Sequence, residues 1–418
     1  MSDYELKFEE SIAKTLFHKL NTLEQTFLRV KSLELKFSYQ ELRQIVEMAV
    51  DFRMWGEAGL IAVWPDHDQK KVVFQRLRKH YEAVRTAPNS YETFTPDIKA
   101  HEQKFSFHTK EKEGLGLGMC PVASEKTRCC NLLTLDAVES CGFDCTYCSI
   151  QSFYKQDKIT FDSGFADKLK NLNLDPNKTY HIGTGQSSDS LMWGNKEGLL
   201  DTLFEFARNN PNVLLEFKTK SKKIGYFLEN DVPKNIICTY SLNTQTIVEN
   251  EEHLAASLDE RIAAARALAD KGVVVGFHFH PIVVYENYLE EYGAVYQRLQ
   301  NEFKPQEVAL VSMGTLTFIK PVIKQLRERD FKSKILQMPF EDASGKSSYP
   351  LEVKREMFKH AYEAFNTWHD NVFFYLCMED QSLWMECLGY EYNTNEDLER
   401  AMLYSYAQKV GIEYQFGV

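Results

Sequence analysis

The segment Glu139-Ser-Cys-Gly-Phe-Asp-Cys-Thr-Tyr-Cys-Ser-Ile-Gln151 contains three cysteines in the spacing Cys-x3-Cys-x2-Cys. Thiolates this close together can bind three corners of a cubane iron–sulfur cluster, and the glycine after the first cysteine allows a tight loop. Electron-transfer clusters usually have four cysteine ligands. Three ligands, Cys141, Cys145 and Cys148, leave one iron open, and an open metal position is where a substrate or cofactor can bind.

Two other uses of cysteine fit this segment less well. A structural zinc site needs four ligands, usually in two pairs, and no second pair lies at zinc-finger distance. A disulfide framework disagrees with the odd count of nine cysteines, with the adjacent pair Cys129-Cys130, and with a first segment that lacks the pattern of a secretory signal. We therefore expect reduced cysteines and a cytoplasmic protein.

The composition is that of a soluble globular chain. Its 418 residues are 44% hydrophobic and 26% charged, which is enough for a large core, and no apolar run long enough to span a membrane is present. The net charge of −11 does not favour tight, non-specific binding to a polyanion. The lysine-rich run 218–223 leaves two alternatives open, a local basic groove or a solvated helix start.

The first part of the chain differs from the rest. Over residues 1–95, apolar side chains recur at helical spacing and glycine is scarce, which predicts a helical domain. The turn-rich segment that begins near Thr86 indicates a boundary, and residues 96–129 read as a linker that contains cysteines.

From about residue 130, short apolar runs alternate with amphipathic helical segments. The runs are 132–138, 179–183, 213–219, 235–242, 273–280 and 307–313. This alternation predicts an α/β fold with a parallel sheet, a partial (β/α)6 barrel over residues 130–315, followed by an α/β extension over residues 316–418. In such barrels the chemistry lies at the carboxyl ends of the strands, and the cysteine segment follows the first run.

Strand alternation indicates which side chains point into this barrel. Ser241 and Asn243 share one face of their strand, and His278 and His280 share one face of theirs, with phenylalanines on the opposite face. The loop 181–189 is rich in glycine and hydroxyl groups, so it can approach a ligand closely or simply form a turn and a helix cap. The histidine pair lacks a third metal ligand, which favours substrate contact or core hydrogen bonding.

Together these elements resemble the spore photoproduct lyase family of the radical S-adenosylmethionine (SAM) superfamily. The resemblance rests on short segments in the same order as in that family. They are 141–151, Gly185-Gln-Ser-Ser-Asp189, Phe217-Lys-Thr-Lys220, Tyr240-Ser-Leu-Asn-Thr244, Leu258-Asp-Glu-Arg-Ile262 and Gly276-Phe-His-Phe-His-Pro-Ile282, extended by Gly345–Pro350. The first hundred residues lie outside it.

The resemblance implies roles for individual residues. Cys141, Cys145 and Cys148 would bind a [4Fe-4S] cluster whose open iron is chelated by the amino and carboxylate groups of SAM, with Tyr147 beside the cluster. The positions that it implies near SAM or the substrate are Ser188, Asp189, Lys220, Ser241, Asn243 and His280.

Two positions depart from the family pattern. The lyases have a hydrogen-donating cysteine shortly before the Ser-Asp pair, where this chain has Gln186, and a tyrosine after the third cluster cysteine, where this chain has Ser149. Amide and alcohol groups hold hydrogen in strong bonds, so neither replaces a thiol as a donor, and we do not expect thymine-dimer reversal by the usual relay. We take Gln186 and Tyr147 as catalytic positions and Cys377 as the candidate donor.

The remaining cysteines leave alternatives open. Cys120, Cys129 and Cys130, together with Cys377 and Cys387, could hold an auxiliary cluster or supply the hydrogen donor, or they could be buried thiols, which is how Cys238 is interpreted. The expected function is a radical SAM enzyme that cleaves SAM to a 5′-deoxyadenosyl radical and acts on a DNA or nucleotide lesion, with flavodoxin or ferredoxin as reductant. The alternatives are modification of a peptide or small metabolite, and an iron–sulfur electron carrier or redox-sensing module.

Overall fold

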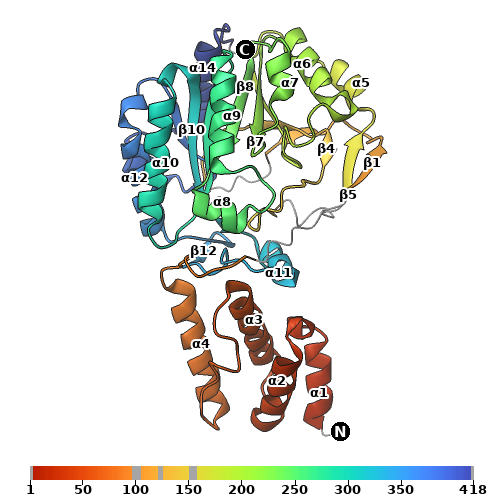
Figure 1. Ribbon diagram of the computed structural model, residues 1–418, viewed down its shortest axis with the longest axis vertical. Coiled ribbons are helices and arrows are strands. Elements are labelled where there is room, and N and C mark those ends of the chain that lie inside the picture. Colours follow the sequence, from red (N-terminus) through yellow and green to blue (C-terminus); the bar gives the residue numbers. More distant parts are fainter. Residues whose placement is uncertain (1–2, 97–104, 121–125, 150–157, 416–418) are drawn as a thin grey trace. The chain divides into compact units, whose positions relative to one another are not determined.

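The computed structural model describes residues 3–96, 105–120, 126–149 and 158–415, and the chain divides into two compact units (Figure 1). The first unit comprises Met1–Lys99, Val284–Glu286 and Thr317–Tyr349, and the second comprises Ala100–Val283, Asn287–Leu316 and Pro350–Val418. The predicted carboxyl-terminal extension, residues 316–418, is therefore divided between the two units. Local apolar patterns identify the elements of such a segment, but they do not show which core each element joins.

The first unit is built on four helices. They are α1 (Asp3–Ile12), α2 (Thr22–Leu35), α3 (Tyr39–Trp55) and α4 (Lys70–Thr86), with a 3-10 helix at Leu16–Lys19. Capping boxes at Asn21 and Ser38 start α2 and α3, because each side chain accepts a hydrogen bond from the third helical residue. Ile45, Val46 and Trp55 of α3 are fully buried and form the centre of this unit.

The later segment of the first unit adds a helix and a small sheet. The helix is α11 (Lys320–Glu328), and the sheet has the order β11 (Thr317–Phe318), β13 (Lys346–Ser348), β12 (Glu341–Ala343), all antiparallel. A bidentate ion pair from Arg327 on α11 to Asp51 on α3, at 2.8 and 2.7 Å, ties this segment to the four helices.

The second unit contains an eight-stranded sheet. Its spatial order is β14 (Phe373–Leu376), β10 (Val308–Thr315), β9 (Val274–Ile282), β8 (Ile236–Ser241), β7 (Val213–Thr219), β6 (Tyr180–Thr184), β3 (Leu133–Leu135) and β2 (Leu117–Met119). All neighbours are parallel except β2, which pairs antiparallel with β3. The predicted α/β class with six barrel strands is confirmed, and β14 and β2 extend the sheet at its two edges.

The predicted first strand, 132–138, is interrupted. It forms β3 and, after a break, β4 (Val138–Glu139), which pairs with β5 (Lys158–Asp162). Together with β1 (Ser106–Lys110), these strands form a separate three-stranded sheet. The cysteine segment therefore leaves from this small sheet rather than directly from the barrel strand.

Helices alternate with the barrel strands and cover the outer face of the sheet. The helices of this unit are α5 (Phe165–Lys170), α6 (Leu199–Asn209), α7 (Gly225–Glu229), α8 (Gln245–Glu251), α9 (Leu258–Asp270), α10 (Tyr288–Glu302), α12 (Leu351–Ala364), α13 (Ser382–Leu388) and α14 (Asn395–Val410). Figure 1 shows α9 and α10 beside the strands. No helix among the described residues is long and apolar enough to cross a membrane.

The two faces of the sheet have different chemistry. On the outer face, Phe279 packs edge-on against Tyr296 of α10, and Phe277 packs against Phe303. The prediction that these phenylalanines pack on outer helices is confirmed. The inner face carries polar side chains, and α14 lies over part of it, because the Tyr406 ring contacts the ring of His181 on β6.

Candidate functional site

The cysteine loop, residues 140–148, is held in place by the segment that follows α8. The Thr146 amide donates to the Glu251 carbonyl at 2.8 Å, and Cys145 forms an isolated antiparallel bridge with Glu252. The Thr146 hydroxyl also donates to the Glu251 carboxylate. The positions of the thiols therefore depend on residues about a hundred positions later in the chain.

Gly142 has no room for a side chain. A Cβ atom there would lie 2.1 Å from Met192 Cε, 2.7 Å from the Phe105 ring and 2.9 Å from the Trp193 ring. The Gly142 amide donates to Met192 Sδ at 3.2 Å. The glycine lets the loop pack directly against these three side chains.

The three predicted cluster ligands belong to one group of apolar side chains. The other members of this group are Phe105, Phe143, Tyr147, Met192, Trp193, Leu254 and Ala255. Desolvation raises the pKa of Cys141 to about 12 and raises the pKa of Cys145 well above its ordinary value. The neighbouring Lys220 ammonium opposes this rise at Cys145, because a positive charge favours the thiolate.

The chemistry of these thiols fits a cubane cluster better than a single ion. Among the residues that the structure describes, no three His, Cys, Asp or Glu side chains converge to hold one metal ion. A cubane cluster binds each thiolate to a separate iron, so its ligands surround a volume instead of a point. Metal binding displaces the protons that desolvation retains on the thiols, and an apolar wall excludes water from the metal.

Glu252 connects the cysteine loop with the residues predicted to bind SAM. Its fully buried carboxylate accepts hydrogen bonds from the Tyr147 hydroxyl and, at 3.3 Å, from Asn243 Nδ2. It lies 2.5 Å from Arg261 Nη2 and 4.0 Å from Lys220 Nζ. Desolvation alone would raise the pKa of Glu252, but the two cations lower it overall, so the group is a carboxylate.

Sequence reasoning missed both Glu252 and Arg261. A single acidic residue after a helix has no periodic signal. Arg261 does have one, because it lies at helical spacing from Leu258 and Ala265, on the apolar face of α9, and is fully buried. A cation on an apolar helix face requires a buried acid as its partner, and this requirement points to a site.

Asp189 organises the loop after β6. One carboxylate oxygen accepts from the amides of Leu191 and Met192, at 3.0 and 2.9 Å, and from Thr219 Oγ1 at 2.7 Å. The other accepts from the Lys220 amide at 2.7 Å. Desolvation raises the pKa of Asp189 despite these bonds. The side chain thus joins the β6 loop to the end of β7 and positions Lys220.

The rest of this loop is equally constrained. Gly185 has φ of +79°, and a Cβ there would lie 2.4 Å from Ser190 Oγ, so only glycine fits. Ser188 Oγ accepts from Trp193 Nε1 at 2.9 Å, and Gln186 Oε1 accepts from the Thr134 hydroxyl. Ser187 is bound through both its amide and its hydroxyl, at 2.8 Å each, by Asp136, a second acid that sequence reasoning missed.

The remaining predicted SAM residues lie at the carboxyl ends of neighbouring strands. Ser241 ends β8, and its carbonyl accepts from Arg261 Nη1 at 3.0 Å. Asn243, fully buried, donates to the Pro281 carbonyl at 3.2 Å and accepts from the Tyr292 hydroxyl. The structure therefore brings Tyr147, Lys220 and Asn243 together around Glu252, whereas His280 belongs to a different network.

That network is a chain of buried polar groups on the inner face. Glu216 contacts His181 Nε2 and His278 Nε2, both at 2.7 Å, and Ser312 Oγ lies 2.5 Å from His278 Nδ1 and 2.9 Å from His280 Nε2. Desolvation lowers the pKa of His278 to about 4 and the pKa of His280 well below its ordinary value. Both imidazoles are therefore neutral at neutral pH.

A second group of thiols lies where the segment before β3 meets the segment after β14. Thr127 forms an antiparallel bridge with Asp380, and the Gln381 amide donates to the Lys126 carbonyl at 2.9 Å. This pairing brings the segment that carries Cys129 and Cys130 to the segment that begins with Cys377. Cys120 joins them because its amide donates to the Leu132 carbonyl at 3.0 Å.

These thiols affect one another electrostatically. A hydrogen bond from the Cys130 thiol lowers the pKa of Cys129 to about 6. Desolvation raises the pKa of Cys377 to about 12, with Lys218 opposing and Cys120 and Cys129 adding to the rise. Cys377 is therefore a protonated thiol at neutral pH. Within the described chain, this group does not converge on a single metal position, and an auxiliary cluster stays a prediction.

The comparison with curated proteins finds relatives of one kind. The chain is 24% identical over 180 residues to a spore photoproduct lyase of Clostridium acetobutylicum, covering 42% of this chain and 53% of that protein. It is 22% identical over 202 residues to a spore photoproduct lyase of Geobacillus sp. (strain Y412MC61), covering 47% and 59%. The chain thus spans somewhat more than half the length of these curated relatives.

Solved structures show the same fold. Spore photoproduct lyase complexed with dinucleoside spore photoproduct superimposes with a TM-score of 0.55 at 18% identity, covering 66% of this chain and 83% of that one. A mutant of that lyase with bound AdoMet and dinucleoside spore photoproduct gives a TM-score of 0.53 with the same coverage and identity. The spore photoproduct lyase family model matches residues 134–349, half of the chain. The chain belongs to the spore photoproduct lyase family.

Proposed function

We propose that this protein is a radical SAM enzyme that acts on a nucleic-acid lesion. The observation that carries the proposal is the position of Cys141, Cys145 and Cys148 in one cluster of apolar side chains, joined through Glu252 to Lys220 and Asn243. When bound, a [4Fe-4S] cluster and SAM supply a 5′-deoxyadenosyl radical. The residues of this chain hold these groups and keep water away from them.

The residues around Glu252 suit an amino-acid ligand. Lys220 offers an ammonium group to a carboxylate, and its Nζ lies 5.5 Å from the centre of the Tyr147 ring. Asp189 holds the Lys220 backbone and offers a carboxylate to an ammonium group. The proposed binding residues for SAM are Ser188, Asp189, Lys220, Ser241, Asn243 and His280.

The hydrogen atom that completes the reaction is proposed to come from Cys377. Gln186 accepts a hydrogen bond from Thr134 and holds its own hydrogens in strong N–H bonds. A protonated thiol is the better donor: its S–H bond breaks homolytically, a C–H bond forms on the substrate radical, and the unpaired electron stays on Cys377 sulfur.

A nucleic-acid lesion is the favoured substrate because the structures with the same fold hold a dinucleoside spore photoproduct. A peptide or small metabolite is the second candidate. For the partners, we propose a flavodoxin or ferredoxin as electron donor in the cytoplasm. An auxiliary cluster at Cys120, Cys129 and Cys130 is proposed only as an addition to the main site.

The test of the proposed function is anaerobic reconstitution with iron and sulfide, followed by assay of 5′-deoxyadenosine with dithionite and SAM. The wild type should form it, Cys145→Ala should lose both the cluster and SAM cleavage, and Cys387→Ser, outside both thiol groups, should retain them. A fully loaded protein that does not cleave SAM, and whose cluster EPR signal is unchanged by SAM, would be an electron carrier instead.

The test of Cys377 uses dinucleoside spore photoproduct in D2O, because thiol hydrogens exchange with solvent. The wild type should place deuterium in the product. Cys377→Ala should still form 5′-deoxyadenosine but lose most of the deuterated product. Unchanged deuterium incorporation in the variant would exclude Cys377 as the donor.

A further inference from the structure

The first unit contains a groove with a volume of about 710 Å³. It is bordered by α3, by α11 and by the residues that follow α1. Its basic side chains are Lys14, Arg43, Lys320, Lys324 and Arg327, and its acidic side chains are Glu47 and Glu328. Positive charge therefore dominates the groove, and none of its lining residues belongs to the proposed radical site.

The basic side chains of the groove differ in how far they are neutralised. The charge of Arg327 is neutralised within the fold, because its guanidinium binds Asp51 in bidentate fashion and lies 3.5 Å from the Glu47 carboxylate. Arg43 reaches Glu47 only at 3.8 Å. Within the described residues, Lys14, Lys320 and Lys324 form no ion pair, and all three are exposed. Three ammonium groups are thus available to a ligand.

The charge distribution along the chain agrees with an anionic ligand. The residues of the first unit contain slightly more Lys and Arg than Asp and Glu, although the whole chain has a net charge of −11. The acidic excess therefore lies entirely on the second unit. A positive patch in an otherwise acidic chain is typical of a site that binds a polyanion.

Two further features favour a nucleic acid as that polyanion. Tyr39, at the start of α3, lines the groove and is 38% exposed, so its ring is available to stack on a base. Lys320 is the first residue of α11, where the helix dipole also attracts phosphate, and Lys324 lies one helical turn further along.

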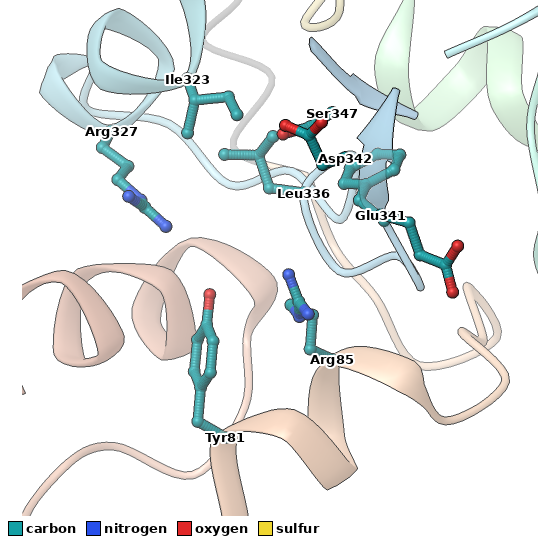
Figure 2. A pocket seen from close by; sticks show the side chains of 9 residues that line it. Tyr81, Arg85, Ile323, Arg327, Leu336, Glu341, Asp342 and Ser347 are labelled. Atoms are coloured by element: carbon teal, nitrogen blue, oxygen red, sulfur yellow. The ribbon is translucent and has the colours of Figure 1, made fainter. Parts of the chain in front are cut away.

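A smaller neighbouring pocket, of about 170 Å³, is a weaker anion site. It shares Ile323 and Arg327 with the groove, and Figure 2 shows that Arg85, Arg327, Glu341 and Asp342 also line it. Because Arg327 is already paired with Asp51, Arg85 is the one remaining arginine among the described residues that line this pocket with its two carboxylates, and the pocket therefore attracts phosphate less than the groove does.

We propose that the groove of Lys14, Arg43, Lys320 and Lys324 binds the sugar–phosphate backbone of a nucleic acid, with Tyr39 as a stacking surface. This makes the first unit a docking module for the substrate, and in this respect the inference rests on the proposed function. Phosphate contacts by lysine give affinity without sequence preference and release counterions, so binding must weaken steeply with salt.

The experiment measures fluorescence anisotropy of a short labelled DNA duplex with the full-length protein, over a range of salt concentrations. The groove variant is Lys320→Glu/Lys324→Glu. The control is Lys7→Glu/Lys31→Glu, which makes the same change in net charge on α1 and α2, outside the groove. All four lysines lie on the surface of helices, and thermal unfolding should confirm that both variants fold.

We expect the groove variant to bind at least about tenfold more weakly at low salt. The slope of log affinity against log salt concentration is negative and should become less steep by about two, because each of the two lysines neutralises about one phosphate. The control should change little. Equal binding by the wild type and the groove variant, or binding that is insensitive to salt, would overturn the proposal.

The result of this DNA-binding experiment can be distinguished from the result of the SAM-cleavage test of the proposed function. DNA binding needs neither the cluster nor SAM, and 5′-deoxyadenosine formation without substrate does not need the groove. A groove variant that cleaves SAM normally but loses DNA affinity supports both proposals. DNA binding through the groove without SAM cleavage would contradict only the proposed function.

Discussion

The substitution Glu252→Gln tests whether the proposed radical site is assembled around one buried carboxylate. Glutamine keeps the shape of the side chain and can still hydrogen-bond to Tyr147 and Asn243, but it removes the negative charge. Arg261 is then a fully buried cation without its counter-ion, and Lys220 loses its nearest carboxylate. The second unit should therefore become less stable, and the cysteine loop should be held less firmly in place.

The size of the effect follows from this burial. Removing one partner of a buried ion pair typically costs about 3–5 kcal/mol, because the other charge stays desolvated. For a unit of this size, about 2 °C of Tm per kcal/mol is the lower end of the expected range, so Tm should fall by at least about 6–10 °C. The cysteine loop should also lose order, since Cys145 pairs with the backbone of Glu252.

The pH dependence gives an independent check. The pKa of Glu252 lies below its ordinary value, so its contribution to stability is fully present above about pH 4.5 and is lost as the pH falls through the lower, folded-state pKa. The difference in Tm between the wild type and Glu252→Gln should be constant from pH 6 to 8 and should shrink in acid.

The assay is thermal unfolding of the cluster-free protein by far-UV circular dichroism, followed by iron content after reconstitution. The control is Glu249→Gln on α8, whose exposed carboxylate accepts a bond from Gln245 and whose loss should change stability by less than about 0.5 kcal/mol. A Tm for Glu252→Gln within about 2 °C of the wild type, with full iron content, would refute the reasoning.

Two further predictions concern the inner face and the β6 loop. The pKa of His278, which is influenced by Glu216, Lys218 and His181, is lowered to about 4, so its ring should stay neutral from pH 8 down to pH 5 in NMR spectra of histidine-labelled protein. The stability of the protein should fall as the pH drops from about 6.5 towards 4, because the unfolded chain then binds a proton that the folded chain does not. A charged His278 ring at pH 6 would contradict this prediction. The substitution Gly185→Ala should lower the stability by about 1–3 kcal/mol, because residue 185 has a positive φ and a Cβ there would contact Ser190. The control Gly118→Ala should have little effect on Tm, because there is open space around its Cβ. Equal Tm values for the two variants would show that the loop adapts to the new side chain.

Much of the barrel could be predicted because the signals are local. Each barrel strand is a short apolar run bounded by helices, and alternation along β9 separates His278 and His280 from Phe277 and Phe279. The interruption after β3 could not be predicted from the apolar run 132–138, because pairing of β4 with β5 depends on a strand more than twenty residues later. The division of residues 316–418 between two units is a similar case, since it depends on which core buries each element.

The sequence by itself determined the parallel α/β architecture and the family and predicted which thiols bind the metal, since cysteine spacing and strand periodicity are properties of neighbouring residues. Only the tertiary structure decided how these parts become a site. Glu252, Arg261 and Asp136 act through contacts between segments far apart in the chain, and Asp189 proved to be bonded to backbone amides in two loops. Buried charges must find partners wherever the fold supplies them, and this pairing cannot be read from spacing.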